Sequence, residues 1–207
     1  MTLRTDQDDQ WVEREFDGER FDGDISDLSI EDCRFSRCSF HGVRLSEATI
    51  ERSTFDACDF TSARLDGAVI SHSAFLNCTF RMARLFGARF TECKMTGSGF
   101  DEADLGGIKI VGGDWSFVDL SGRTLIGLDL HGLRLTDANL AFADLRQADL
   151  RDADLTRGRL DEAKLAGADL RGATLDGVDL TRLALDGVRL DVAQAILVVR
   201  ALGAVVD

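Results

Sequence analysis

Residues 31–90 read EDCRFSRCSFHGVRLSEATI, ERSTFDACDFTSARLDGAVI and SHSAFLNCTFRMARLFGARF in three successive blocks of twenty. Each block has a large apolar residue at every fifth position, and this spacing continues without a break from Ile25 to Leu190. Self-similarity at a fixed period is typical of a repeat solenoid. The simplest interpretation is a coil with four five-residue sides, in which residue n stacks under residue n+20.

A second inward position lies two residues before each large apolar residue, and it holds a small side chain. Neither a helical period of 3.6 nor strand alternation of 2 produces this five-residue pattern. One large and one small inward residue per side would fill a narrow square interior completely. In the first half the small positions are Ala48, Ser53, Cys58, Ala63, Ala68, Ser73, Cys78, Ala83, Ala88, Cys93, Ser98 and Ala103.

All five cysteines of the chain fall in this small inward position. Cys38, Cys58 and Cys78 are twenty residues apart, so metal ligation or a redox pair is one interpretation. A layer spacing of roughly 4.8 Å lies within the Cα range that a disulfide permits. Alanine and serine fill equivalent positions, however, and free cysteine commonly serves as a small buried hydrophobe. We therefore favour a structural role.

Arg123 is an exception to the inward pattern, because it occupies one of the small positions. A charged side chain is costly in a dry interior. It should either bend outward or pair with an acid, and we expect a local distortion there.

The sequence carries no catalytic or metal-binding motif. His41, His72 and His131 are scattered, and no phosphate loop, nucleophile elbow or paired-histidine metal motif is found. We expect a protein without enzymatic activity, cofactor or metal. No secretory signal or membrane-spanning apolar run is found either, which favours a cytoplasmic protein that does not bind membranes.

Three segments are expected along the chain. Residues 1–10 are polar and acidic and are predicted to be mobile. Residues 11–190 form the solenoid, although the step from Phe21 to Ile25 is four residues instead of five, so the first coil lacks one residue or is built differently. Residues 191–207 form a capping helix.

The C-terminal helix has its own sequence signals. Asp191 and Gln194 resemble a capping box, and Gly203 is a plausible left-handed stop. A helix here would at minimum cover the exposed end of the stack, as terminal caps do in repeat proteins. Apolar residues recur at helical spacing and form a candidate dimer interface: Val192, Ala195, Ile196, Val199 and Leu202.

Segments ANLAF, ADLRQ and ADLRD at residues 138–152 resemble the A(D/N)LXX consensus of pentapeptide repeat proteins. The resemblance implies an all-β fold, a right-handed quadrilateral β-helix of about nine coils ending in a short α-helix. QWVEREF at 10–16 and GVRLDVAQA at 187–195 further resemble the MfpA-type members, which interact with DNA gyrase. That likeness implies a homodimer joined at the C-terminal end. Qnr-type relatives carry loops that interrupt the coil, but the unbroken register here indicates that such loops are missing.

The net charge of −13 is unevenly distributed. Residues 1–50 carry −7, 51–100 carry +1, 101–150 carry −5 and 151–207 carry −2. Nine layers spaced by roughly 4.8 Å make a rod of about 43 Å, with one net charge per roughly 3.3 Å, whereas duplex DNA has one per about 1.7 Å. Mimicry of DNA therefore requires the acids to gather on particular faces. Direct binding of nucleic acid is disfavoured because no basic stripe is present.

Many aspartates stand immediately before the large inward residue, where the repeat consensus itself supplies Asp. Each aspartate singly is more readily explained by a structural role than by a functional one. A binding partner would nevertheless interact with their summed negative charge. The resemblance implies that they form a gyrase-binding acidic surface that would occupy the DNA-binding saddle. The candidate residues are Asp104, Asp119, Asp129, Asp144, Asp149, Asp154, Asp169 and Asp179.

Two functions follow from this sequence. The first is a DNA-mimicking protein that binds gyrase, modulates its activity and protects it from quinolone-like or natural-product poisons, including self-protection in a producer. The alternative is a non-catalytic interaction scaffold with a partner other than a topoisomerase.

Overall fold

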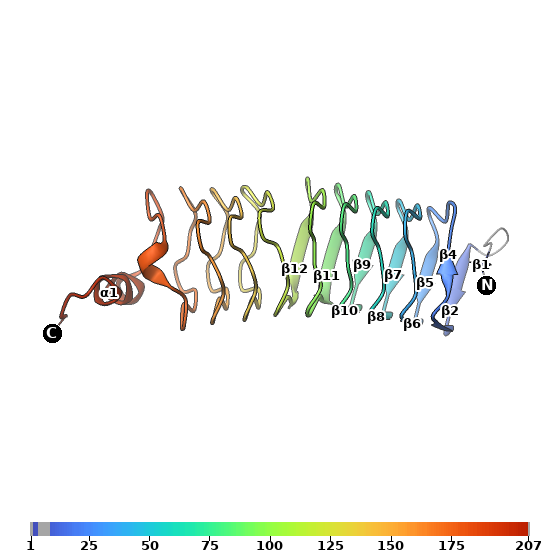
Figure 1. Ribbon diagram of the computed structural model, residues 1–207, viewed down its shortest axis with the longest axis horizontal. Helices are drawn as coiled ribbons and strands as arrows, with labels where there is room; N and C mark the ends of the chain where they lie inside the picture. Colours follow the sequence, from blue (N-terminus) through green and yellow to red (C-terminus); the bar gives the residue numbers. More distant parts are fainter. Residues whose placement is uncertain (1, 4–8, 207) are drawn as a thin grey trace.

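The computed structural model describes residues 2–3 and 9–206 as a straight rod of stacked coils (Figure 1). Strand β1 (Thr2–Leu3) lies at one end and helix α1 (Val192–Ala201) at the other. The other strands are short and occupy the first part of the rod. They are β2 (Gln10–Val12), β3 (Glu15–Asp17), β4 (Arg20–Phe21), β5 (Ser29–Glu31), β6 (Arg34–Ser36), β7 (Thr49–Glu51), β8 (Thr54–Asp56), β9 (Val69–Ser71), β10 (Ala74–Leu76), β11 (Arg89–Lys94) and β12 (Lys109–Asp114).

Neighbouring coils pair in parallel with the predicted offset of twenty residues. Ile30 pairs with Ile50 and Ile50 with Ile70, so each residue stacks on its equivalent in the next coil. In the first coil the offset is nineteen, since Trp11 pairs with Ile30. The offset returns to twenty where Asp24 pairs with Arg44. The Gly23 carbonyl accepts from Arg44 as the Val43 carbonyl accepts from Arg64, so the irregular step after Phe21 is one residue missing from the end of the third side of the first coil.

The predicted fold class is confirmed as an all-β, four-sided β-helix with a short C-terminal α-helix. The predicted count of about nine coils is not matched by regular strands. These give five successive pairings, from β2 through β5, β7, β9 and β11 to β12. Beyond β12 the chain stacks through single bridges, which continue as far as the pairing of Asp169 with Arg189 (Figure 1).

The coil has four faces, which we number in the order in which the chain visits them from Trp11. Each face is a column of five-residue sides, and each side is centred on its large inward residue. Face 1 is centred on Trp11, Ile30, Ile50 and their equivalents, and face 2 on Phe16, Phe35 and Phe55. Face 3 is centred on Phe21, Phe40 and Phe60, and face 4 on Ile25, Leu45 and Leu65. Faces 1 and 3 are opposite, as are faces 2 and 4.

Stacked aromatic rings fill the first half of the interior. The rings of Phe35 and Phe55 lie 4.5 Å apart at an angle of 2°, and those of Phe40 and Phe60 lie 4.8 Å apart at 2°. All four side chains are buried. Such pairs contribute about 0.5–1.5 kcal/mol each beyond the area that they bury. The large apolar residue of each repeat thus packs on its own equivalents above and below.

The five cysteines are free and buried in the small inward position, as predicted. Burial raises the pKa of the Cys38 thiol to about 11 and also raises the pKa of Cys33 and Cys93. A raised pKa keeps these sulfurs protonated, and a thiol is a poor nucleophile and metal ligand. Their surroundings therefore fit the structural role.

Tight turns join the sides of each coil and place one residue per corner in the left-handed region. Many of these residues are not glycine, including Phe117 at φ 60° and Phe142 at φ 60°. Gly113 differs because it lies in a small inward position at φ 99°, where a Cβ would stand 2.1 Å from the carbonyl oxygen of Cys93. Only glycine fits there, two residues before the buried Trp115.

Arg123 bends outward and distorts the coil, in agreement with the sequence prediction. Its Nε donates a hydrogen bond to the Ser121 carbonyl at 3.2 Å and its Nη1 to the Ala103 carbonyl at 3.4 Å. The guanidinium thus lies at the junction of two successive coils, bonded to one carbonyl of each.

Helix α1 begins at the predicted capping box. Asp191 accepts a hydrogen bond from the Gln194 backbone N–H at 2.9 Å, and the Gln194 side chain accepts one from the Asp191 N–H at 3.0 Å. The buried Nε2 of Gln194 also donates to the Ala173 carbonyl at 2.8 Å. Gly203, at φ 91°, follows the last turn as expected.

The predicted mobile segment 1–10 lies mostly outside the described residues. Thr2 and Leu3 pair with Arg20 and Phe21, and Gln10 begins β2. Those three residues therefore belong to the solenoid.

Candidate protein-binding faces

The eight candidate aspartates lie on all four faces of the rod. Asp129, Asp149 and Asp169 are on face 1, Asp154 is on face 2, Asp119 and Asp179 are on face 3, and Asp104 and Asp144 are on face 4. A single acidic face is therefore not built from these residues alone.

Each of the eight aspartates supports its own turn. The side-chain Oδ1 accepts a hydrogen bond from the backbone N–H two residues further on, as between Asp119 and Ser121 at 2.9 Å. The same bond is found in every other candidate, which agrees with the structural interpretation of the consensus Asp. The acceptors are Asp104, Asp129, Asp144, Asp149, Asp154, Asp169 and Asp179.

Three of the candidates form a column on face 1. Asp129 pairs with Asp149 and Asp149 with Asp169 in successive coils. Two of them are compensated, because Arg151 and Arg171 contact the aspartate two residues earlier through paired hydrogen bonds. The Arg171 hydrogen bonds lower the pKa of Asp169 to about 2. This column carries less net negative charge than its aspartates suggest.

The summed charge distinguishes the faces more clearly than any single residue. Face 1, counted from residue 9, carries eleven acidic and six basic residues, and face 3 carries nine and four, so each has a net charge of −5. Faces 2 and 4 carry seven acidic and six basic residues each, a net charge of −1. The rod therefore has two opposite acidic faces separated by two nearly neutral ones. This distribution depends on the four-sided geometry and is hidden in the linear sequence.

The structure adds two acids to the candidates. Asp101 and Glu102 are exposed on face 3 beside Asp104, and none of the three forms an ion pair within the described residues. The run of acids at 101–104 was the available signal, but the prediction considered only the position before the inward residue. Sequence reasoning therefore missed the densest group of uncompensated acids in the middle of the rod.

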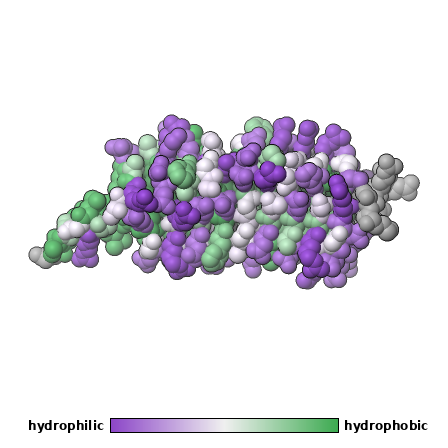
Figure 2. Space-filling model, viewed as in Figure 1, coloured by the Kyte–Doolittle hydropathy of each residue, from purple (hydrophilic) through white to green (hydrophobic). Residues whose placement is uncertain are grey.

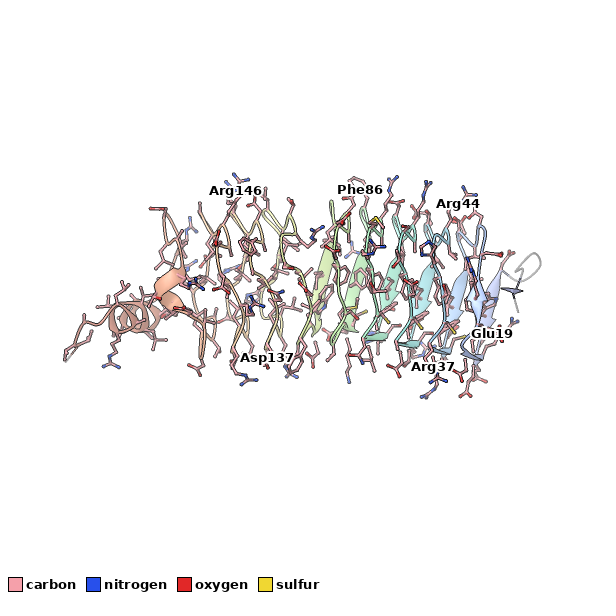
Figure 3. All side chains as sticks on the ribbon, viewed as in Figure 1. Glu19, Arg37, Arg44, Phe86, Asp137 and Arg146 are labelled. Atoms are coloured by element: carbon pink, nitrogen blue, oxygen red, sulfur yellow. The ribbon has the colours of Figure 1, made fainter. Side chains whose placement is uncertain are left out.

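Face 4 runs along one edge of the rod and is mixed in character. Arg44, Phe86 and Arg146 lie along this edge in Figure 3, opposite Arg37 and Asp137. Phe86 is 59% exposed and Ile126 46% exposed, both at equivalent positions of face 4. Face 4 therefore combines exposed apolar area with a net charge near zero, whereas exposed apolar residues on the acidic faces, such as Val111 and Phe142, lie among a net charge of −5.

The predicted dimer interface is available for contact. Gln194 and Val198 face the last coils and are buried, which leaves the other side of α1 uncovered. Val192 is 78% exposed, Leu202 67% and Val199 42%; Ala195 is also exposed and Ile196 is half-buried. Figure 2 shows apolar surface at this end of the rod, whereas the coils are largely hydrophilic. The structure assigns no partner to this surface.

Within the described residues, no group of three or more His, Cys, Asp or Glu side chains is arranged to hold a metal ion. The helices in the same residues are too short or too polar to cross a bilayer.

The geometry defines a β-helical repeat protein whose surface is organised in four charged or mixed faces. Two family profiles match the chain, "Pentapeptide repeat region" over residues 28–105 and "Pentapeptide repeats (8 copies)" over 116–152 and 153–191. The chain is therefore a member of the pentapeptide repeat family. No curated protein sequence matches it.

Several solved structures resemble the chain. Full-length QnrB1, a plasmid-mediated fluoroquinolone resistance protein, has a TM-score of 0.63 at 22% identity, over 94% of this chain and 100% of QnrB1. HetL, a pentapeptide repeat protein involved in heterocyst differentiation regulation from the cyanobacterium Nostoc, has a TM-score of 0.42 at 22% identity, over 87% and 84% of the two chains. At these identities the likeness concerns the fold.

Proposed function

We propose that this protein is a dimeric, DNA-mimicking rod that binds the positively charged DNA-binding saddle of DNA gyrase in the cytoplasm. There it would modulate the enzyme and protect it from quinolone-like or natural-product poisons. The observation that carries the proposal is the pair of opposite acidic faces, each with a net charge of −5. The role of QnrB1 in fluoroquinolone resistance, together with a structural match that spans both chains almost from end to end, supports the choice of target.

Binding in this way needs no covalent chemistry. Two anionic faces separated by the width of a coil can contact basic groups on both walls of a saddle, as the two strands of a duplex do. The protein would compete with DNA, or release a poison from the cleavage complex by displacing the DNA. Association between complementary charged surfaces weakens as salt screens them. The exposed side of α1 would join two rods end to end and extend the charged surface.

Titration of gyrase with this protein, scored by supercoiling and by poison-stabilised DNA cleavage, tests the proposal. A double variant on face 3, Asp101→Asn with Glu102→Gln, removes two uncompensated charges. The matched control on face 2 is Asp56→Asn with Asp176→Asn, which removes two exposed carboxylates that likewise form no ion pair among the residues that the structure describes. We expect the face 3 variant to need about three- to tenfold more protein for the same effect, and the control to need little more.

An absence of any effect at micromolar protein would contradict gyrase as the target. Equal weakening by both double variants would contradict the assignment to the acidic faces, since the same net charge is removed in each.

The alternative function is an interaction scaffold for a partner other than a topoisomerase. The exposed Phe86, Ile126 and Phe142 on or beside face 4 favour it, because charge mimicry alone does not require large apolar side chains on the surface. Pull-down from cell lysate, with gyrase subunits scored against all other proteins, distinguishes the two functions.

A further inference from the structure

The backbone ladder is interrupted in the middle of the rod. In the described chain, no backbone hydrogen bond joins residues 102–112 to residues 121–132, the equivalent part of the next coil. The same two coils remain bonded on the other faces, for example from Phe100 to Asp119 at 3.0 Å and from Trp115 to Arg134 at 2.9 Å. The coils are thus joined on faces 2 and 3 but separated on faces 4 and 1. We call this opening the Arg123 seam.

Arg123 explains the seam. In regular coils the carbonyl equivalent to Ala103 accepts from the backbone of the next coil, as Ala83 does from Asp104 at 2.9 Å. The carbonyl equivalent to Ser121 likewise accepts from the preceding coil, as Asp101 does from Met82 at 2.8 Å. Arg123 takes both acceptors with its guanidinium. A side chain that cannot enter the small inward position therefore replaces two ladder bonds and separates the coils.

The seam contains a cavity of about 310 Å³ on face 4, lined by residues 105–108 and 124–128. Leu105 and Ile108 retain 7% and 5% exposure, whereas the equivalent Leu85 and Ala88 are fully buried. The opening thus gives access to interior apolar side chains that are inaccessible in the regular coils above. Phe86 and Ile126, both exposed, stand on either side of it in the same column of face 4.

Among the residues that the structure describes, the seam leaves backbone N–H and C=O groups unpaired that bond to the neighbouring coil elsewhere in the rod. In a regular coil the N–H groups at the positions of Leu105 and Gly107 donate to carbonyls of the next coil. Leu85 donates in this way to Asp104, and Gly87 to Gly106. At the seam these two donors have no backbone partner within the described chain, and neither do the carbonyls of Thr124 and Ile126. An extended main chain offers alternating acceptors and donors that match such a row, with side-chain pockets giving specificity.

The charge at the rim adds a further constraint. Asp101, Glu102 and Asp104 are exposed next to the seam and form no ion pair in the described part of the chain. A segment that binds here should therefore carry basic residues beside its apolar anchor.

We propose that the Arg123 seam is a docking site for an extended segment of a protein partner. One large apolar side chain of that segment occupies the cavity, its main chain bonds to the unpaired backbone groups, and flanking lysines or arginines contact the acids at the rim. The inference goes beyond the proposed function, because it does not require the partner to be gyrase.

The test uses the full-length protein and the peptide acetyl-Lys-Val-Phe-Val-Lys-amide as the probe, followed by backbone amide NMR. We expect millimolar binding, with chemical-shift changes concentrated at residues 105–107 and 124–128. Two further peptides test the chemistry, one with glutamate in place of lysine and one with serine in place of phenylalanine. Each is expected to bind at least about tenfold more weakly, since it loses the rim charges or the anchor.

Arg123→Ala is the decisive variant, because it restores the small inward residue of the repeat. The ladder should close, seen as slower hydrogen exchange at Leu105 and Gly107, and the peptide should no longer bind. Arg64→Ala, which removes an exposed arginine elsewhere on face 4, is the matched control and should bind normally. Ile126→Glu tests the rim without closing the seam and should weaken binding.

Shift changes spread evenly along the rod, no binding at millimolar peptide, or unchanged binding to a closed Arg123→Ala variant would each overturn the proposal. Gyrase assays on Arg123→Ala separate the two ideas. An unchanged gyrase effect leaves the proposed function standing whatever the peptide does, whereas failure of the wild-type protein in those assays leaves the peptide result untouched.

Discussion

Arg171 holds Asp169 by two hydrogen bonds on face 1, from Nε to Oδ1 at 2.8 Å and from Nη2 to Oδ2 at 2.6 Å. The two residues flank the inward Leu170, so one repeat unit supplies both charges. A column of aspartates in this fold is therefore partly neutralised by arginines of the same repeats. The net negative charge of the column depends on how many of its repeats carry an arginine directly after the inward leucine.

The pKa of Asp169 should report this pairing directly. It is lowered to about 2 by the Arg171 hydrogen bonds, so Arg171→Ala should raise it toward the ordinary value of 3.8. Because the folded pKa lies below that of the unfolded chain, the pair stabilises the fold above about pH 4, and this contribution is lost as the pH falls toward 2. Side-chain carboxyl NMR titration measures the shift. An unchanged pKa in the variant would show that Arg171 is not its cause.

The aromatic stack should be the main source of stability. Phe60 is fully buried between Phe40 and Phe80, and Phe60→Ala should cost about 3–5 kcal/mol. Phe60→Asp should unfold the neighbouring coils, because a charge would enter a dry interior. Phe142→Ala is the control, since Phe142 is exposed, and it should change stability by less than about 0.5 kcal/mol. Urea unfolding of the three variants measures the difference.

Gly113→Ala should destabilise the protein by more than about 2 kcal/mol. It combines a left-handed backbone with a Cβ placed 2.1 Å from the Cys93 carbonyl oxygen, so neighbouring backbone must move. Gly132→Ala is the matched control, because its φ of 64° is also left-handed but no atom lies within 4 Å of the added Cβ. That variant should cost about 1 kcal/mol. Equal thermal midpoints for the two variants would contradict the packing argument.

The exposed side of α1 should control self-association. Leu202→Asp together with Val199→Asp should convert a dimer to a monomer in analytical ultracentrifugation, since both side chains are exposed in the single chain. The melting temperature of the solenoid should change little at low protein concentration. Val198→Asp provides the contrast, because Val198 is buried and its replacement should destabilise the attachment of the helix itself. A wild-type protein that sediments as a monomer would contradict the predicted interface.

The sequence predicts the fold unusually far because five-residue spacing places every side chain of the solenoid. The offset of twenty, the missing residue after Phe21 and the inward cysteines all follow from it, and the capping box at Asp191 follows from its own local signal. The length of the strands does not follow from the spacing. Beyond Asp114 the coils pair only through single bridges, although the five-residue pattern is unchanged.

The candidate site was less accessible to sequence reasoning. The consensus explains why Asp149 and Asp169 are present. That Arg151 and Arg171 compensate much of their charge becomes evident only from the side-chain contacts in the structure. The acidity of faces 1 and 3 is a sum over residues far apart in the chain. Arg123 was identified as an anomaly, yet the resulting opening depends on which carbonyls its guanidinium reaches.

The hydrogen bond from Gln194 to Ala173 has a consequence for assembly. A parallel ladder has an unpaired edge at each end, and such edges can recruit further strands until a filament forms. The Ala173 carbonyl is an acceptor that one more coil would use, as Ala153 is used by Thr174. Gln194 occupies it with a side chain, and α1 lies where that coil would be added. Association at this end therefore uses side-chain contacts between two α1 helices, and such an assembly is complete with two chains. Further coils cannot add to the backbone ladder there, so open-ended polymerisation is prevented.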